Sequence, residues 1–160
     1  SLFSIGHGGL VVSSFFPKAI NFPPPLMLTI WYALHVPLSF LSYALWASAF
    51  SLALNSLSHP DSSPLCSRLM ASDSFYGFLA FSVSMIFGGL WGFVAWGSYF
   101  IWDPKIIWSV ILWIFYATFI HIDAWPVMRR KKAHLLIVGF VFILITYVGT
   151  SFFANSSHSF

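Results

Sequence analysis

The chain has 160 residues, of which 59% are hydrophobic and only 7% are charged. Soluble globular domains carry roughly a quarter charged residues, so this chain cannot form the polar surface that a water-soluble fold needs. The formal net charge of +3 comes mostly from the basic cluster at residues 129–132. Nucleic-acid binding calls for basic residues spread over a face, and this composition excludes it. The single cysteine, Cys66, has no partner for a disulfide or a CxxC site.

Residues 1–25 mix Gly, Ser, Phe and Pro and end in three consecutive prolines, which cannot lie inside a helix. They are predicted to form an interfacial segment, and residues 26–160 a transmembrane domain. The chain begins with Ser1, and nothing at its start has the build of a signal peptide, which is typical of a processed or incompletely represented chain.

The apolar stretch from Leu26 to Leu57 is divided by Pro37. Because proline is favoured in the first turn of a helix, we predict the first membrane helix at residues 37–57, with His35 at its mouth. Residues 58–73 hold two prolines and several serines and are predicted to be a loop. The second helix is predicted at residues 74–91.

Residues 91–103 are too rich in glycine and aromatics for an ordinary helix and are predicted to be a Trp-rich loop. Asp103 can cap a helix and Pro104 suits the position that follows, so a third helix is expected at residues 104–121. A fourth is expected at residues 134–154. The predicted fold is therefore an all-α integral membrane bundle of about four transmembrane helices.

The basic cluster predicts the orientation of this bundle. It lies between the third and fourth helices, and the positive-inside rule places such a loop on the cytoplasmic, matrix or stromal side. Counting crossings from there puts the Trp-rich loop, His35 and His158 together on the outer side, and Cys66 on the inner side. The expected location is a bacterial inner membrane, or a mitochondrial inner or thylakoid membrane.

The tryptophans of the loop region are spaced by five or six residues, and two of them adjoin glycines; they are Trp91, Trp96, Trp102 and Trp108. An aromatic belt at the membrane interface is one interpretation. Belts need neither a fixed spacing nor adjacent glycines, which let a large planar ligand approach closely. A wide apolar pocket with flat walls would suit a porphyrin.

Two histidines on the predicted outer side, His35 and His158, are candidate ligands for a porphyrin iron, because neutral imidazole is a common axial ligand. Taken singly, each is equally explained as a solvated interfacial histidine. His121 is predicted at the far end of the third helix. It is either an interfacial polar residue or a second, deeper heme contact, since ionisable residues in membrane spans are functional candidates.

Three strings, WGSYFIWDPK, IIWSVILWIFYATFIH and ALHVPLSFLSYALW, resemble the tryptophan-rich WWD superfamily of cytochrome c biogenesis proteins, of the CcsA and CcmC types. The resemblance implies that the WWD loop binds heme b at the outer face and that His35 and His158 ligate its iron. It also implies that His121 corresponds to a histidine that ends the next helix in the CcsA type.

The chain departs from the family pattern in several places. HVP resembles the CcmC type, whereas WDPK and the final HSF are closer to the CcsA type, so the branch stays open. Ile106 stands where Glu is usual, and Phe100 where Trp is common. Family members are longer, with further helices before the first histidine and after the last, so we expect another subunit to supply these helices or a reduced member of the family.

The expected function is heme binding and presentation to apocytochrome c or a heme chaperone during c-type cytochrome maturation. Trp91, Trp96, Trp102 and Asp103 would form the platform, with Asp103 fixing the loop by capping. Whether the chain is part of a cytochrome c heme lyase is open, and no catalytic residue is assigned. The alternative is a noncatalytic accessory subunit of a larger, respiratory-type membrane complex.

The expected partners are other membrane subunits and lipid. Close helix packing in membranes uses small residues, and the candidates are Gly88, Gly89, Gly139 and Gly149. Packing within the chain's own bundle explains these glycines equally well.

Overall fold

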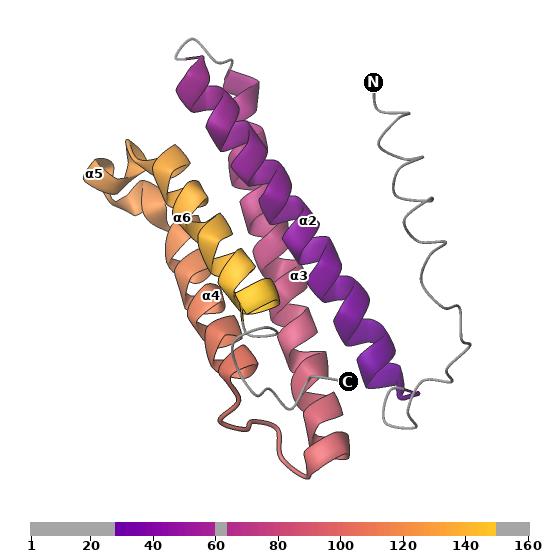
Figure 1. Cartoon of the computed structure of the whole chain (residues 1–160). Coiled ribbons are helices and arrows are strands. Elements are labelled where there is room, and N and C mark those ends of the chain that lie inside the picture. Colours follow the sequence, from indigo (N-terminus) through magenta and orange to yellow (C-terminus); the bar gives the residue numbers. More distant parts are fainter. Residues whose placement is uncertain (1–27, 60–63, 150–160) are drawn as a thin grey trace, which may run out of the picture.

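The computed structural model describes residues 28–59 and 64–149, and every regular element in this part of the chain is helical (Figure 1). Four helices cross the molecule in alternating directions, and each packs on two others in the order α2, α3, α4 and α6. The helices and helical turns are α2 (Ile30–Ser58), α3 (Pro64–Trp96), α4 (Pro104–Ile120), η2 (Ile122–Ala124), α5 (Pro126–Arg129), α6 (Lys132–Leu144) and the π-helical η3 (Ile145–Gly149).

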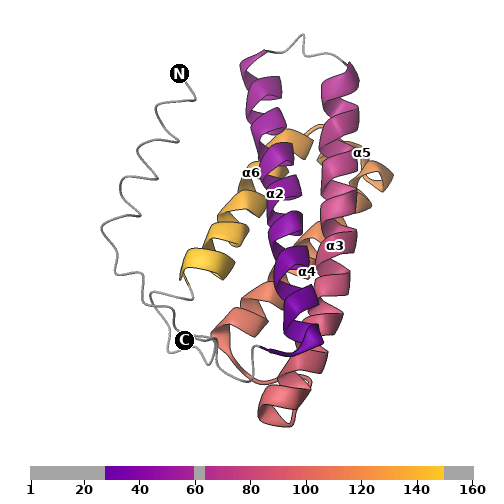
Figure 2. The ribbon, with the colours of Figure 1, turned by 90° about the vertical axis from the view of Figure 1, so that its right-hand side faces the viewer.

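Two of the helices are long enough to span a bilayer with residues to spare. Helices α2 and α3 have 29 and 33 residues and apolar compositions. At 1.5 Å per residue they measure about 44 and 50 Å, against roughly 30 Å for the hydrocarbon core. Helix α4, with 17 residues, is at the lower end of the length that a span requires. The α2–α3 hairpin therefore projects past the α4–α6 pair at one end (Figures 1 and 2).

Helix α2 begins at Ile30, so the predicted start at Pro37 is wrong, and His35 lies inside the helix instead of at its mouth. Proline is tolerated within membrane helices where neighbouring groups bond the backbone around it. Pro37 leaves the carbonyl of Ala33 without its helical amide. Beside the proline, the hydroxyls of Ser39 and Ser84 both donate to the carbonyl oxygen of His35, at 3.0 and 2.8 Å, and the second bond joins α3 to α2.

Helix α3 extends beyond its predicted limits at both ends. It begins at Pro64, where proline fits the first turn because no amide donor is needed there, so much of the predicted 58–73 loop is helical. It continues to Trp96 and stops before Gly97, whose φ of +72° is readily adopted only by glycine. Trp91 is therefore helical, and the connecting loop is residues 97–103.

Helix α4 begins where the sequence predicts. The Asp103 carboxylate accepts a hydrogen bond of 2.8 Å from the amide of Lys105, and Pro104 is the first helical residue. Helix α6 starts at Lys132, slightly before the predicted position, and gives way to the π-helical η3 at Ile145. The remainder of the predicted fourth helix, up to Ala154, lies outside the described residues.

Three helices meet around Trp46, which is fully buried. Its ring stacks on Tyr116 of α4, with centroids 3.7 Å apart and planes 6° from parallel, and its indole nitrogen donates to the carbonyl of Ser74. A Cβ atom at Gly77 would lie 2.6 Å from that nitrogen, so glycine permits the close approach of α2 and α3.

Two of the four glycines singled out for helix packing lie against side chains of this bundle. A Cβ atom at Gly139 of α6 would lie 2.7 Å from Phe115 of α4, and one at Gly88 would lie 2.8 Å from His35. Packing within the bundle therefore accounts for both. Gly89 makes a looser approach to the carbonyl of Tyr99, and Gly149 closes η3.

The two ends of the bundle are formed by different elements. The start of α2, the 97–103 loop and η3 lie at one end, called here the loop end, and η2, α5 and the start of α6 lie toward the other (Figure 1). Cys66, near the start of α3, belongs to the second end. It is only 6% exposed, and its Sγ lies 3.6 Å from the carbonyl oxygen of Leu52.

Candidate functional site: an aromatic cavity containing His35

A cavity of about 280 Å³ opens at the loop end, between α2, α3, the 97–103 loop and the first turns of α4. This aromatic cavity is close to the lower limit of roughly 300 Å³ that is usual for small-molecule sites. Most of its wall is apolar, with flat rings on several sides. The aromatic residues that line it are Tyr32, Phe40, Tyr43, Phe81, Trp91, Trp96, Tyr99, Phe100 and Tyr147.

His35 lines this cavity with one ring nitrogen already bonded. Its Nδ1 lies 2.8 Å from the carbonyl oxygen of Ser84, and because a carbonyl only accepts, Nδ1–H is the donor. In the neutral ring Nε2 then carries the lone pair, and no group of the described residues forms a hydrogen bond with it. Histidines that bind metals usually show this arrangement, with the second ring nitrogen donating to a carbonyl or carboxylate.

The position of the imidazole is set by α3. The ring packs on Gly88, where a Cβ atom would lie 2.8 Å from Nδ1 and 2.9 Å from Cε1. The hydroxyls of Ser39 and Ser84 are 2.6 Å apart and connect the two helices beside it. These contacts hold the ring in one orientation before any ligand arrives.

Trp91 and Trp96 form one wall of the cavity from the last turns of α3. Trp91 is only 2% exposed and packs between Tyr32 of α2, at a centroid distance of 5.4 Å, and Trp96, at 4.9 Å. The planes of the two indoles meet at 72°, an edge-to-face arrangement that aromatic rings favour. Trp91 is therefore packed on both sides by aromatic rings.

Trp102 and Asp103 do not line the cavity. Trp102 is 85% exposed and meets Phe100 edge-on at 5.5 Å, so its indole is displayed outward at the loop end. Asp103 is buried and caps α4 through the amide of Lys105. The structure therefore brings His35, Trp91 and Trp96 together and leaves Trp102 on the surface beside them.

The other two predicted histidines are not in the cavity. His121 caps the C-terminal end of α4, toward the opposite end of the bundle, and its Nδ1 lies 2.8 Å from the carbonyl oxygen of Ala117. His158 lies outside the described residues. The predicted iron site depends on the distance between His35 and His158. The described residues do not include His158, so they do not test this distance.

Lys105 is a cavity residue that sequence reasoning missed. Among the described residues that line the cavity, it alone carries a formal charge. It follows Pro104 in the first turn of α4 and lines the same cavity as His35. Its position in the WDPK string could have marked Lys105 as a site residue. The sequence could not show, however, that the start of α4 lies close to α2.

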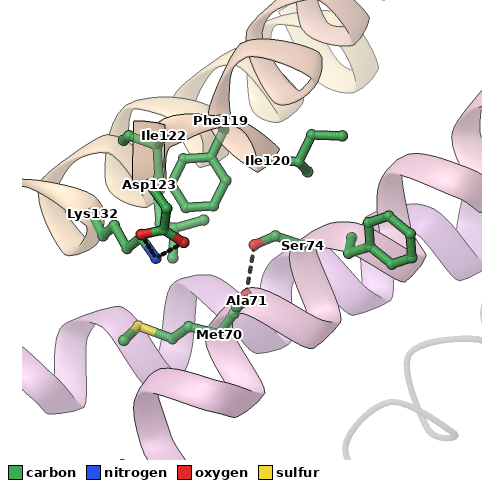
Figure 3. A pocket seen from close by; sticks show the side chains of 10 residues that line it. Met70, Ala71, Ser74, Phe119, Ile120, Ile122, Asp123 and Lys132 are labelled. Carbon is green, nitrogen blue, oxygen red and sulfur yellow. Dashed lines mark hydrogen bonds and ion pairs between the residues drawn. The ribbon is translucent and has the colours of Figure 1, made fainter. Parts of the chain in front are cut away.

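A second cavity, of about 190 Å³, lies between α3 and the α4–α6 pair at the other end (Figure 3). An ion pair between Lys132 and Asp123, with an N–O distance of 2.6 Å, closes one side. No histidine lines it, and the described residues contain no cluster of three or more metal-ligating side chains. The aromatic cavity is therefore the candidate site.

The residues of the aromatic cavity fit a metalloporphyrin in kind. His35 offers an unprotonated imidazole nitrogen, Trp91 and Trp96 offer an apolar wall of two indole rings, and Lys105 offers a positive charge. An axial ligand, an apolar surface and a counter-charge are what a heme with its carboxylate side chains requires.

The described elements are all helical, and α2 and α3 are long and apolar enough to cross a membrane; together with the family match that follows, this confirms the predicted class of all-α integral membrane protein. The sequence profile of a family described as cytochrome C assembly protein matches residues 2–158. The chain belongs to that family, and the predicted family is confirmed.

Curated relatives named "Cytochrome c biogenesis protein CcsA" match about half of the chain. The one from Gloeobacter violaceus is 42% identical over 87 residues, which is 52% of this chain and 25% of the relative. The one from Prochlorococcus marinus strain AS9601 is 37% identical over 87 residues, 52% of this chain and 28% of the relative. For Trieres chinensis the identity is 40% over 85 residues, 52% of this chain and 27% of the relative. The matched segment thus spans about a quarter of each relative.

Proposed function

We propose that this chain binds heme in the aromatic cavity and takes part in the assembly of c-type cytochromes, with Nε2 of His35 as one axial ligand. The observation that carries the proposal is the hydrogen bond from His35 Nδ1 to the carbonyl of Ser84, 2.8 Å long, which leaves Nε2 unprotonated at an aromatic cavity. Family membership supplies the cytochrome context, because the cofactor of a cytochrome is heme.

Each residue of the cavity has a defined task in this proposal. The Ser84 carbonyl holds the proton on Nδ1 and keeps Nε2 available, and Gly88 gives the imidazole room. The wall formed by Trp91 and Trp96 excludes water from the face of the ring system. When bound, the heme supplies an iron centre and vinyl groups, and the residues hold and orient it.

Noncovalent heme b fits the chain better than covalently attached heme. Thioether attachment requires cysteines beside the heme, and the single cysteine of the chain, Cys66, is buried toward the other end of the bundle. A noncovalently held heme can be passed on to an apocytochrome or a heme chaperone. The second axial ligand in this proposal is His158, which rests on the family resemblance alone.

The test is the absorption spectrum of the purified protein, with and without added hemin. The wild-type chain is expected to show a heme Soret band, and His35→Gly to weaken binding by at least about tenfold, because an axial ligand is lost. Added imidazole can occupy the vacated position and should restore the band. His134→Gly is the matched control, because His134 is exposed at the other end.

Equal heme binding by His35→Gly and the wild-type chain would overturn the assignment of His35. A wild-type chain that neither carries heme nor takes it up on titration would overturn the proposed function and favour the accessory-subunit alternative.

A further inference from the structure

The positive charge of Lys105 is unusual for its surroundings. The cavity it lines is built mostly from aromatic and aliphatic side chains of four helical elements and a loop. Lys105 is half-buried, and a ligand carboxylate that enters the cavity can pair with its ammonium.

None of the described residues that line the cavity carries a carboxylate. Among the described residues the salt bridge is the one between Lys132 and Asp123, toward the opposite end of the bundle. Asp103, two positions before Lys105, does not line the cavity and uses its carboxylate to accept from the Lys105 backbone amide at 2.8 Å. A carboxylate that reaches Lys105 from inside the cavity would therefore belong to a ligand.

The same cavity holds the nitrogen available to a metal. Lys105 reaches the cavity from the first turn of α4 and His35 from α2. A ligand that places its metal at His35 and extends toward α4 would meet an ammonium group. A porphyrin that carries carboxylates along one edge has this distribution of metal and charge.

We propose that Lys105 binds the carboxylates of the porphyrin and so sets the orientation of the heme, with its anionic edge toward the N-terminus of α4. This proposal rests on the proposed function. Lys105 is then a specificity-determining residue, because it distinguishes porphyrins with free carboxylates from those whose carboxylates are blocked. A charge-assisted hydrogen bond to a carboxylate is strong in such a low-dielectric site.

The experiment compares hemin with hemin dimethyl ester, in which both carboxylates are neutral. Each is titrated into the detergent-purified wild-type chain, Lys105→Gln, Lys105→Arg and the control Lys132→Gln, and binding is followed by the Soret band. The wild-type chain is expected to bind hemin at least about tenfold more tightly than the diester, as is usual for a hydrogen bond to a charged group. Lys105→Gln should lose this preference, and Lys105→Arg and Lys132→Gln should keep it.

Because the two porphyrins partition differently into detergent, the quantity compared between variants is the ratio of their affinities. Unchanged affinity of Lys105→Gln for the diester shows that the cavity has folded. Lys105→Gln with the wild-type ratio, or a wild-type chain that does not discriminate, would overturn the role of Lys105 and leave heme binding intact. Failure of the wild-type chain to bind either porphyrin would instead count against the proposed function.

Discussion

At the scale of single residues, the position of His35 depends on the absence of a side chain at Gly88. A Cβ atom there would lie 2.8 Å from Nδ1, closer than real Cβ contacts allow, and the ring is tied to the Ser84 carbonyl. Gly88→Ala should therefore displace the imidazole. We expect heme affinity to fall by about tenfold, equivalent to ~1.4 kcal/mol, in an absorption titration.

The matched control is Gly89→Ala, one residue along the same helix. A Cβ atom at Gly89 would lie 3.5 Å from the carbonyl oxygen of Tyr99, an ordinary contact. Its affinity for heme should stay near that of the wild-type chain. If both alanine variants bound heme normally, the packing of Gly88 on His35 would have no part in ligand binding.

At the scale of elements, the start of α4 fixes both the loop and Lys105. The Asp103 carboxylate caps the helix by accepting from the Lys105 amide. Asp103→Ala should lower the free energy of unfolding by ~0.5–2 kcal/mol, whereas Asp103→Asn should retain most of it, because asparagine caps almost as well as aspartate. Thermal unfolding in detergent, followed by circular dichroism, measures the difference.

Comparing Asp103→Asn with Asp103→Ala also separates the effect of the helix cap from the effect of the negative charge. An Asp103→Asn variant as unstable as Asp103→Ala would show that the negative charge, and not the cap, is what α4 requires.

The helix that was predicted best is the one with local signals at its start. Asp103 and Pro104 act on their own turn, so α4 could be placed from the sequence. Pro37 and the glycines near Trp91 were taken as helix ends, although packing against neighbouring helices overrides both. The boundary at Gly97 follows from a positive φ that composition does not reveal.

The candidate site was predictable to a similar degree. That His35, Trp91 and Trp96 would lie on one side followed from counting helices, and the cavity contains all three. The contacts of His35 with Ser84 and Gly88, and the entry of Lys105, depend on how α2, α3 and α4 are set against one another. The residue pattern of a single helix cannot predict how these three helices pack together. The ligand roles of His35, His121 and His158 stay predictions.

At the scale of the whole molecule, the loop end lies opposite the end formed by η2, α5 and the start of α6 (Figure 1), which includes the basic residues 129–132. The positive-inside rule predicts that this second end faces the cytoplasm, matrix or stroma. The native cysteine cannot test this, since Cys66 is buried and would react poorly from either side. In a Cys66→Ala background, Trp102→Cys and Lys131→Cys each place an exposed thiol at one end. An impermeant thiol reagent added to right-side-out vesicles should label Trp102→Cys and spare Lys131→Cys.

Opening the vesicles should make Lys131→Cys reactive, which is the internal control. Labelling of Lys131→Cys in sealed vesicles, with Trp102→Cys protected, would reverse the orientation and place the aromatic cavity on the cytoplasmic, matrix or stromal side.

The π-helical turn η3 changes the angular positions of the residues that follow α6 around the helix axis. Its hydrogen bonds run from residue i to i+5, so it contains one residue more than an α-helical turn would. Tyr147 lies in this turn and lines the cavity beside Phe40 and Tyr43, at centroid distances of 5.9 and 6.0 Å. Deleting Ile145 would leave an α-helical turn with one residue fewer and move Tyr147 to a different position around the helix axis. The number of residues in η3, as much as their identity, therefore decides whether this side of the cavity is closed by an aromatic ring.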